Sequence, residues 1–441
     1  MSAADNLKSI DTIVVVMMEN RSFDHVLGYM SHELFGNRAD VDGLHQHGAN
    51  FDWDNPDDQG RFYSPTATPD GYVPGDLPHS RDSIAQQLNG GAMDGFIKAY
   101  FAYQGTDRSP VPMRFCKPTD IPITAALAQR YTVCDRWFAS LPDDTFANRL
   151  MAISGTTLID STTGIEPVLN PLPPQNTIFD WLASKGKSFE VYVDAVSIAD
   201  VGAPSFLLMM NSQWKHLANA HTLDTLQGRW SSANKAPDVI YCEPFYNDFA
   251  TALGTHGTDN HPPLPMAYGE GFLKKVYEVL SSNPAKWNKT MLVICYDEHG
   301  GFFDHVAPPG MKFNPPPGNK WTSQTAFNTL GVRVPGIVVS PFVPKGGCFN
   351  GLLDHTSILQ LMVDRFGAPA DLAYFGDAVS RKANRIVSLA ETLSADAPDT
   401  SVVALPAAPS IPGGWATSPA ITEIATIFRK AIAAFRASGG K

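Results

Sequence analysis

The sequence lacks several features that would assign it to a particular class of protein. No segment approaches the ~20 consecutive apolar residues of a membrane-spanning helix, so no transmembrane segment is predicted. Aspartate and glutamate (44) outnumber lysine and arginine (33), and the formal charge of −11 argues against a nucleic acid as partner. Residues 1–11 show no secretory signal, so the chain as written is expected in the cytoplasm, with export as the alternative.

Cysteine is scarce and gives no sign of a disulfide framework. The five cysteines are odd in number and far apart, and no C-x-x-C pair occurs. Cys134, Cys242 and Cys295 lie within apolar, strand-like runs, so we expect them to be reduced thiols in the core.

Short β-branched runs alternate with helical patterns along much of the chain. Continuous apolar runs of this length are typical of strands buried on both faces, and their alternation with helices indicates a mostly parallel sheet covered on both sides. The sequence therefore predicts an α/β fold. The expected strands are 12–18, 131–135, 189–194, 237–242, 291–296 and 334–340, and the expected helices include 84–88, 271–280 and 356–366.

Residues 1–387 are predicted to form a single α/β domain with two excursions from its sheet. The stretch 41–122 is rich in Gly, Pro, Asp and aromatic residues, and 197–235 is polar. Both are expected as long loops or small caps that frame a binding site. Residues 388–441 are expected as an extended tether followed by a helix that begins near Ser418 and docks on the domain.

Two of the expected strands end in polar clusters. Glu19 and Asn20 follow the strand 12–18, and the run 297–301 (Asp-Glu-His-Gly-Gly) follows the strand 291–296. Ligands bind beyond the carboxyl ends of parallel strands, and carboxylates brought together there would repel each other unless a cation lay between them. Oxygen ligands favour Ca, Mg, Mn or Fe over Zn. The alternative is that both clusters are ordinary polar strand ends.

The segment 141–151 contains a hydroxyl at an expected helix start. A strand is expected to end near Phe138, and a helix to begin just after Thr145. The N–H groups and the positive dipole end of a helix favour an alkoxide and a bound phosphate, and a metal contact would lower the hydroxyl pKa further. The alternative is that Thr145, Asp143 or Asp144 merely caps the helix.

Five of the twelve histidines lie in loop contexts rich in Gly, Pro and Asp. Loops often carry catalytic groups, and a histidine near a leaving oxygen can donate the proton that hydrolysis needs. The alternative for each is an ordinary surface histidine. These residues are His79, His261, His299, His305 and His355.

Four motifs occur in an order that carries a family resemblance. Residues 18–25 read MENRSFDH, 145–149 TFANR, 297–306 DEHGGFFDHV and 354–359 DHTSIL. They resemble the signatures of the bacterial phosphoesterase family of phosphocholine-type phospholipases C and acid phosphatases, over residues 10–370. The first and third of these motifs are long and specific, so the chain is identified as a member of that family.

The resemblance implies an alkaline-phosphatase-like, three-layer α/β/α fold and a phosphoric ester hydrolase. It also implies a single metal ion and a covalent phospho-threonine intermediate on Thr145, whose hydroxyl would be both nucleophile and metal ligand. The other implied ligands match Glu19, Asn20, Asp297 and Glu298.

The resemblance also suggests roles for the groups around the phosphate. His79 and His261 look similar in context to the histidines that line the phosphate site, and one of them would protonate the leaving oxygen. The further candidates for substrate contact are Arg149, His299 and His355.

The chain departs from the family pattern G-P-T-x-P-N-R around the nucleophile. Asp143 and Asp144 precede Thr145, and Phe146 and Ala147 follow it, so the turn is expected to differ and two extra carboxylates to lie near the phosphate. The substrate is expected to be either a phosphomonoester or a phosphodiester such as a phospholipid, with a soluble substrate slightly favoured. The alternative from another class is a catalytically weak phosphate-ester-binding protein on the same fold.

Overall fold

A large mixed sheet forms the centre of the molecule. The computed structural model describes residues 2–47, 50–51, 53–69, 71–105, 108–162, 171–194, 210–246 and 256–411. The sheet strands in this part of the chain are β1 (Thr12–Met18), β8 (Thr132–Cys134), β9 (Phe189–Val193), β10 (Ala220–Thr222), β11 (Val239–Glu243), β12 (Thr290–Tyr296), β15 (Gly336–Val339) and β16 (Cys348–Phe349). Their order is β10-β9-β11-β1-β12-β15-β8-β16.

The sheet is mostly parallel. The strands from β10 to β12 run in one direction, β15 is antiparallel to both of its neighbours, and β8 and β16 are parallel to each other. The predicted α/β fold with a mostly parallel sheet is therefore confirmed. Each of the six expected strands has a counterpart in the sheet. Every residue of β1 and β12 is buried, as expected for continuous apolar runs in strands that are covered on both faces.

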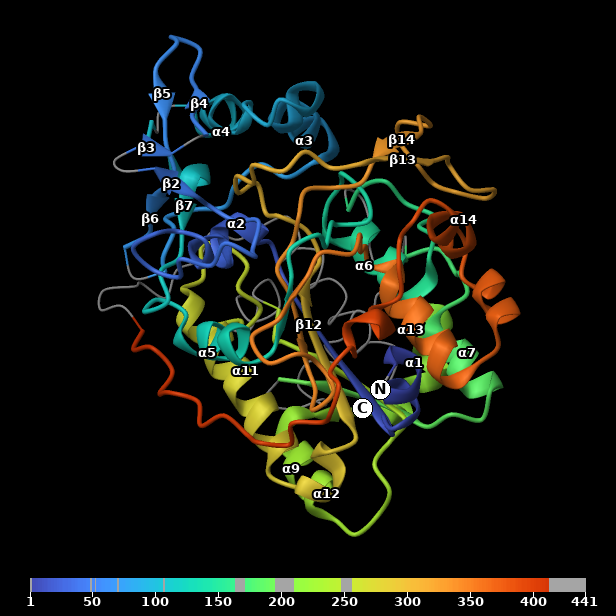
Figure 1. Ribbon diagram of the computed structural model, residues 1–441. Coiled ribbons are helices and arrows are strands. Elements are labelled where there is room, and N and C mark those ends of the chain that lie inside the picture. The colour runs from blue at the N-terminus through green and yellow to red at the C-terminus, as the bar shows by residue number, and fades with distance from the viewer. Residues whose placement is uncertain are drawn as a thin grey trace.

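Helices cover both faces of the sheet (Figure 1). One layer contains α5 (Pro122–Arg130), α9 (Leu226–Ser231), α11 (Met266–Ser281) and α12 (Pro284–Trp287), with α11 in contact with the other three. The other layer contains α1 (Ala3–Lys8), α6 (Thr145–Ser154), α7 (Ile178–Ser184), α13 (Thr356–Phe366) and α14 (Ala378–Ala383), with α13 packed on α6 and α14. The expected three-layer arrangement is therefore present.

The first excursion lies beyond the carboxyl ends of the parallel strands (Figure 1). It contains α3 (Arg81–Leu88) and α4 (Phe96–Gln104), and it builds small strand pairs: β2 (Gln46–His47) with β3 (Asn50–Phe51), β4 (Asn55–Pro56) with β5 (Phe62–Tyr63), and β6 (Thr66–Ala67) with β7 (Arg114–Phe115).

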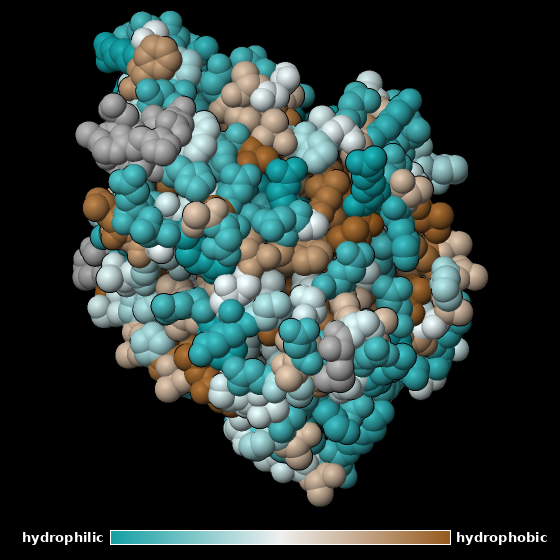
Figure 2. Space-filling view, in the orientation of Figure 1, coloured by the Kyte–Doolittle hydropathy of each residue, from teal (hydrophilic) through white to brown (hydrophobic). Residues whose placement is uncertain are grey.

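The molecular surface is notched beside this excursion. Figure 2 shows the notch between the segment containing α3 and the segment containing the hairpin of β13 (Gly310–Phe313) and β14 (Phe327–Thr329). At the start of α3, the Arg81 guanidinium donates a hydrogen bond of 2.6 Å to the Ser323 hydroxyl, which joins the two segments.

The second excursion contributes to the sheet as well as to its surface. Its described part contains the 3₁₀ helix η5 (Asn211–Asn219), the edge strand β10 and the helix α9. The sequence did not predict β10, whose three residues are too few for a periodic signal.

The described part of the C-terminal region lies along the domain. After the 3₁₀ helix η8 (Leu389–Thr392), the backbone N–H of Ala395 donates to the Phe342 carbonyl and that of Val403 to the Tyr277 hydroxyl. The expected final helix lies outside the described residues, and the domain division stays a prediction. Among the described helices, none combines the length and apolar character of a membrane span.

The cysteine prediction agrees with the structure. Cys134, Cys242 and Cys295 are buried free thiols.

Candidate active site

The ends of β1 and β12 bring four predicted ligand residues together. The two strands are neighbours in register, with Met18 opposite Tyr296, so the residues that follow them meet. The backbone N–H of Asn20 donates to Asp297 Oδ1 at 3.0 Å. Glu19, Asn20, Asp297 and Glu298 are all buried.

The backbone beneath these ligands is tightly turned. Asn20 has φ 57° and Gly300 has φ 61°, both in the left-handed region. A Cβ on Gly300 would lie 2.2 Å from the Asn20 carbonyl oxygen. Glycine is therefore required for this approach of the two loops.

The two neighbouring carboxylates have different protonation tendencies. Burial, opposed by Arg149 and reinforced by the Glu298 charge, raises the pKa of Asp297 to about 6. Burial also acts to raise the pKa of Glu298, but His79 and His299 outweigh it, and the pKa falls below its ordinary value. The pair therefore needs local positive charge to stay ionised.

These residues fit a hard metal ion. Their donor atoms are carboxylate and amide oxygens, and Glu298 Oε1 is buried with no hydrogen-bond partner among the described residues. A bound cation would satisfy that oxygen and reduce the repulsion between the carboxylates.

Thr145 is the first residue of α6, so the helix begins one residue earlier than the sequence predicted. Its Oγ1 donates to Asn20 Oδ1 at 3.3 Å, so the hydroxyl points to the ligand group. Asp144 has the N-cap position but makes no side-chain capping bond; its Oδ2 instead accepts from the Thr162 N–H at 3.0 Å. The alternative of a helix cap therefore fits neither the Thr145 nor the Asp144 side chain.

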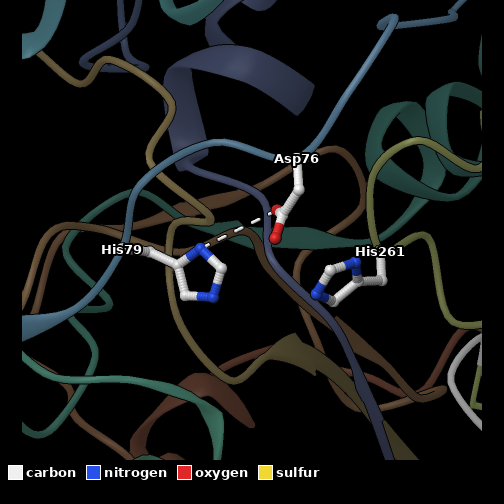
Figure 3. A group of neighbouring side chains, drawn as sticks. All are labelled: Asp76, His79 and His261. Carbon is white, nitrogen blue, oxygen red and sulfur yellow. Dashed lines mark ion pairs between the residues drawn. The ribbon is translucent and has the colours of Figure 1, made fainter. Parts of the chain in front are cut away.

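His79 and His261 lie near each other, with Asp76 beside them (Figure 3). His79 Nε2 is 3.3 Å from Asn20 Nδ2, and the two histidine rings are 6.1 Å apart between centroids. Asp76, which the sequence analysis missed, has Oδ1 3.9 Å from His79 Nδ1. Its only sequence signal is a carboxylate three residues before a loop histidine.

The His79 ring lies in a strongly negative environment. Burial acts to lower its pKa, but the carboxylates of Glu298 and Asp76 outweigh burial, and with smaller contributions from the Leu77 carbonyl and Asp144 the pKa rises to about 9. His79 therefore holds a proton at neutral pH whenever no other cation is present.

Arg149 joins the two strand ends from α6. Its Nε donates to Asp297 Oδ2 at 3.1 Å, its Nη2 is 3.5 Å from Glu19 Oε1, and its Nη1 donates to the Tyr246 hydroxyl at 2.7 Å. Burial acts to lower the pKa of Arg149, but Tyr246, Asp297 and Glu19 raise it overall. Tyr246 lies in a connection whose sequence gave no hint of this contact.

His299 and His355 contact two of the ligand residues, Glu298 and Asp297. His299 Nδ1 lies 3.2 Å from Glu298 Oε2, and its Nε2 lies 2.8 Å from Gln87 Oε1. His355 accepts from Trp137 Nε1 and donates from its own Nε2 to the Asp297 carbonyl at 2.6 Å. Burial lowers the pKa of His355 to about 4, so this ring is neutral.

The two carboxylates that precede Thr145 are both buried but face different groups. Burial and Asp144 raise the pKa of Asp143 well above its ordinary value, while the charges of Asp160 and Arg81 also act on it. Asp144 interacts electrostatically with His79 and Glu298, and burial raises its pKa. Of Asp143 and Asp144, only Asp144 therefore interacts with the histidine pair.

The chain matches known proteins over most of its length. The model of the Phosphoesterase family matches residues 10–369. Non-specific phospholipase C6 of Arabidopsis thaliana is 33% identical over 89% of this chain and 74% of its own. Phospholipase C A of Mycobacterium tuberculosis (strain ATCC 25618 / H37Rv) is 30% identical over 92% of this chain and 82% of its own.

A structural match is more remote. The crystal structure of a protein in the alkaline phosphatase superfamily from Vibrio parahaemolyticus covers 59% of this chain and 64% of its own, with 9% identity and a TM-score of 0.33. A score this low carries no argument, so the fold rests on the sheet order and the helix layers given above.

The family match and the identity to two phospholipases C agree with the motifs and with the meeting of their residues at the ends of β1 and β12. The chain belongs to the Phosphoesterase family and is a phosphoric ester hydrolase.

Proposed function

We propose that the chain cleaves phosphoric esters in a metal-dependent reaction with a covalent phospho-threonine intermediate on Thr145. One observation carries the proposal: the Thr145 hydroxyl, at the first turn of α6, reaches Asn20 beside the buried carboxylates of Glu19, Asp297 and Glu298. The N-terminal N–H groups of α6 favour negative charge at this position.

The proposed reaction consists of two successive displacements at phosphorus. Thr145 Oγ1 attacks phosphorus and the alcohol of the ester leaves; water then attacks the phospho-threonine and restores the hydroxyl. A metal held by Glu19, Asn20, Asp297 and Glu298 would supply positive charge for the phosphoryl oxygens and favour the ionised hydroxyl.

His79 and His261 are proposed to serve the leaving oxygen. The carboxylates of Glu298 and Asp76 raise the pKa of His79 and so favour its protonated form, and a proton placed near the departing oxygen allows it to leave as an alcohol. Because water must lose a proton in the second step, the same ring can take that proton back.

Arg149, His299 and His355 are proposed to position the catalytic groups. Arg149 holds Asp297 and Glu19, His299 contacts Glu298, and His355 donates to the Asp297 backbone. These contacts keep the oxygen atoms of the ligand group in place through a full catalytic cycle.

A phospholipid is the proposed substrate class, with the products a diacylglycerol and a phosphorylated headgroup. The similarity to phospholipases C from a plant and a mycobacterium supports this choice over the soluble substrate that the sequence analysis slightly favoured. A phosphomonoester remains the second candidate, because the attacking group and its neighbours act on phosphorus in either ester.

The test is a screen of the purified protein against a chromogenic monoester, a chromogenic diester and phosphatidylcholine vesicles, each with Ca²⁺, Mg²⁺, Mn²⁺ or Fe²⁺ after chelation. We expect turnover of phosphatidylcholine to exceed that of the monoester and to vanish with EDTA. Full activity in EDTA would overturn the metal assignment. Binding without turnover of any ester would favour the weak binding protein instead.

A further inference from the structure

Gln87 joins the loop that carries His79 to a residue of the ligand group. It lies in the last turn of α3, and its side chain is fully buried. Its Nε2 donates to the Pro78 carbonyl at 2.6 Å, and its Oε1 lies 2.8 Å from His299 Nε2. His299 Nδ1 in turn lies 3.2 Å from Glu298 Oε2. A series of three contacts therefore connects the residue before His79 with a predicted metal ligand.

The Pro78 carbonyl fixes the direction of these hydrogen bonds, because a carbonyl can only accept. The amide nitrogen of Gln87 must therefore face Pro78, and the amide oxygen must face His299. That oxygen accepts from the Nε2–H of the His299 ring. One primary amide thus supplies both the donor and the acceptor that the two neighbours need, and an apolar side chain of the same length can supply neither.

The place of Gln87 in α3 explains how it reaches Pro78. Helix α3 starts immediately after His79, with Ser80 as its N-cap. Side chains of an α-helix point toward its N-terminus. Gln87 lies about two turns along the helix, so its side chain points back toward the loop from which the helix begins.

The turn that follows Glu298 also contacts this loop. Gly301 has φ 75°, and a Cβ at this position would lie 2.7 Å from the Leu77 Cβ and 2.7 Å from the Pro78 oxygen. The Leu77 carbonyl oxygen lies 2.7 Å from His79 Nδ1 and so orients that ring. The backbone that orients His79 is therefore packed directly on the backbone of the ligand motif, and Gln87 holds the two together.

We propose that Gln87 is a positioning residue that holds the proton donor His79 at a fixed place relative to the metal ligand Glu298. The amide fixes the separation between the Pro78 carbonyl and the His299 ring, and each of these contacts one of the two groups. Only the proton-donor role of His79 rests on the proposed function; the hold on the loop does not. A displacement of ~1 Å caused by a residue outside the reaction can cost about 10²-fold in rate.

The kinetic test uses Gln87→Met, which keeps the length of the side chain and removes both hydrogen bonds. Two esters of the class that the wild type cleaves are compared, one with an alkyl and one with a nitrophenyl leaving group. We expect kcat for the alkyl ester to fall by roughly 10–100-fold. The nitrophenyl ester should lose less, because its leaving group departs without a proton from His79. In a His79→Ala background, Gln87→Met should no longer distinguish the two esters.

Gln360→Met is the matched control. Gln360 is likewise a buried glutamine whose Nε2 donates to a backbone carbonyl, that of Ile386, at 3.0 Å. It lies on α13 and lines a surface cavity together with residues of α1. This variant should keep the wild-type ratio of the two kcat values. Melting temperatures show whether both variants are folded and lose comparable stability.

A second variant covers the case in which Gln87→Met does not fold. Gln87→Glu keeps an oxygen that accepts from His299 and loses the amide that donates to Pro78. The ratio of the two kcat values should change in the same direction as in Gln87→Met, because the loop that carries His79 is released in both.

Hydrogen–deuterium exchange measures the hold on the loop without turnover. The peptide that contains residues 76–80 should exchange faster in Gln87→Met than in the wild type, and at the wild-type rate in Gln360→Met. This measurement needs no substrate, so its result is independent of the reaction that the protein catalyses.

An equal loss of kcat with both esters would overturn the role of Gln87, as would an unchanged exchange rate of residues 76–80. A preference between the esters that Gln87→Met still alters without His79 would overturn it as well. A wild type that hydrolyses no phosphate ester would instead overturn the proposed function. Faster exchange in Gln87→Met would then leave the hold of Gln87 on the loop standing.

Discussion

Two clusters contain buried acidic residues from the same two sequence motifs. They differ in the groups that neutralise their carboxylates. The strand-end cluster contains Glu19, Asp297 and Glu298. The arginine cluster contains Asp24, Asp304, His305 and Arg333. Asp24 lies five residues after Glu19, and Asp304 six residues after Glu298, so each motif contributes residues to both clusters.

Internal cations satisfy the arginine cluster. Arg333 Nε donates to Asp304 Oδ1 at 2.8 Å, and its Nη2 donates to Asp24 Oδ1 at 3.1 Å. His305 Nδ1 lies 2.7 Å from Asp24 Oδ2, and its Nε2 lies 3.1 Å from Asp42 Oδ1. The geometry of Asp24, Asp304 and His305 alone could suit a metal, but the guanidinium already occupies that role.

The strand-end cluster is left with a buried carboxylate oxygen that has no hydrogen-bond partner among the described residues, Glu298 Oε1. The difference teaches that acidic residues of one motif serve two purposes. One set is neutralised within the protein and holds the loops together, and the other keeps one buried carboxylate oxygen, without a hydrogen-bond partner among the described residues, that a ligand can satisfy. Functional sites often carry such locally unfavourable groups, which the surrounding structure supports.

The largest expected effect is on Thr145. Thr145→Ala should lower kcat by several orders of magnitude with the fold intact, because it removes the attacking oxygen, and Thr145→Ser should keep appreciable activity. Steady-state kinetics with melting temperatures checks this. A simple helix cap would instead cost about 0.5–2 kcal/mol of stability with little change in kcat. Acid quench and peptide mass analysis should find phosphate on Thr145; a fully active Thr145→Ala protein would contradict the mechanism.

The next effect concerns the histidine pair. His79→Ala and His261→Ala should each slow turnover of a substrate with a poor leaving group by roughly 10²–10⁴-fold. A nitrophenyl ester should suffer less, because its leaving group departs without a proton. Comparing kcat for the two substrates in each variant tests the assignment, which near-normal rates on the poor leaving group would exclude.

Replacing one carboxylate by an amide in each cluster should change the stability of the protein by different amounts. Asp304→Asn leaves the buried Arg333 without its full charge partner and should lower the free energy of unfolding by roughly 3–5 kcal/mol. Asp297→Asn should cost less than that, because it also removes like-charge repulsion, while it abolishes metal binding and activity. Denaturant titration of both variants in EDTA gives the answer; equal losses of stability would show that the clusters do not differ.

The smallest effect is a pH dependence of stability from His305. Burial acts to lower its pKa, but Asp24 and Asp42 outweigh burial and raise it to about 9. The folded-state pKa therefore lies above the ordinary value of ~6.5. The stabilisation, up to roughly 3 kcal/mol, is present in full below pH ~6.5 and is lost as the pH rises through about 9. His305→Gln should flatten the decline in melting temperature across that range, and an unchanged profile would rule out this role.

The sequence by itself determined six of the eight sheet strands in the described part of the chain, and it placed the candidate ligand residues at the ends of two of them. The continuous apolar runs of β1 and β12 can only be buried on both faces, and the polar residues after them then meet because parallel neighbours end at one edge. The start of α6 at Thr145 followed from local helix-start chemistry. These predictions succeed because burial and helix initiation leave signals within a few residues.

Only the tertiary structure decided which polar groups became partners. Asp76 and Gln87 reach the site from the first excursion, and His299 and His355 turned out to lie behind the ligand residues. Arg333 neutralises Asp24, which lies far from it in the chain. The physical reason is that hydrophobic periodicity encodes whether a residue is buried, whereas the identity of its polar partner depends on how distant loops pack together.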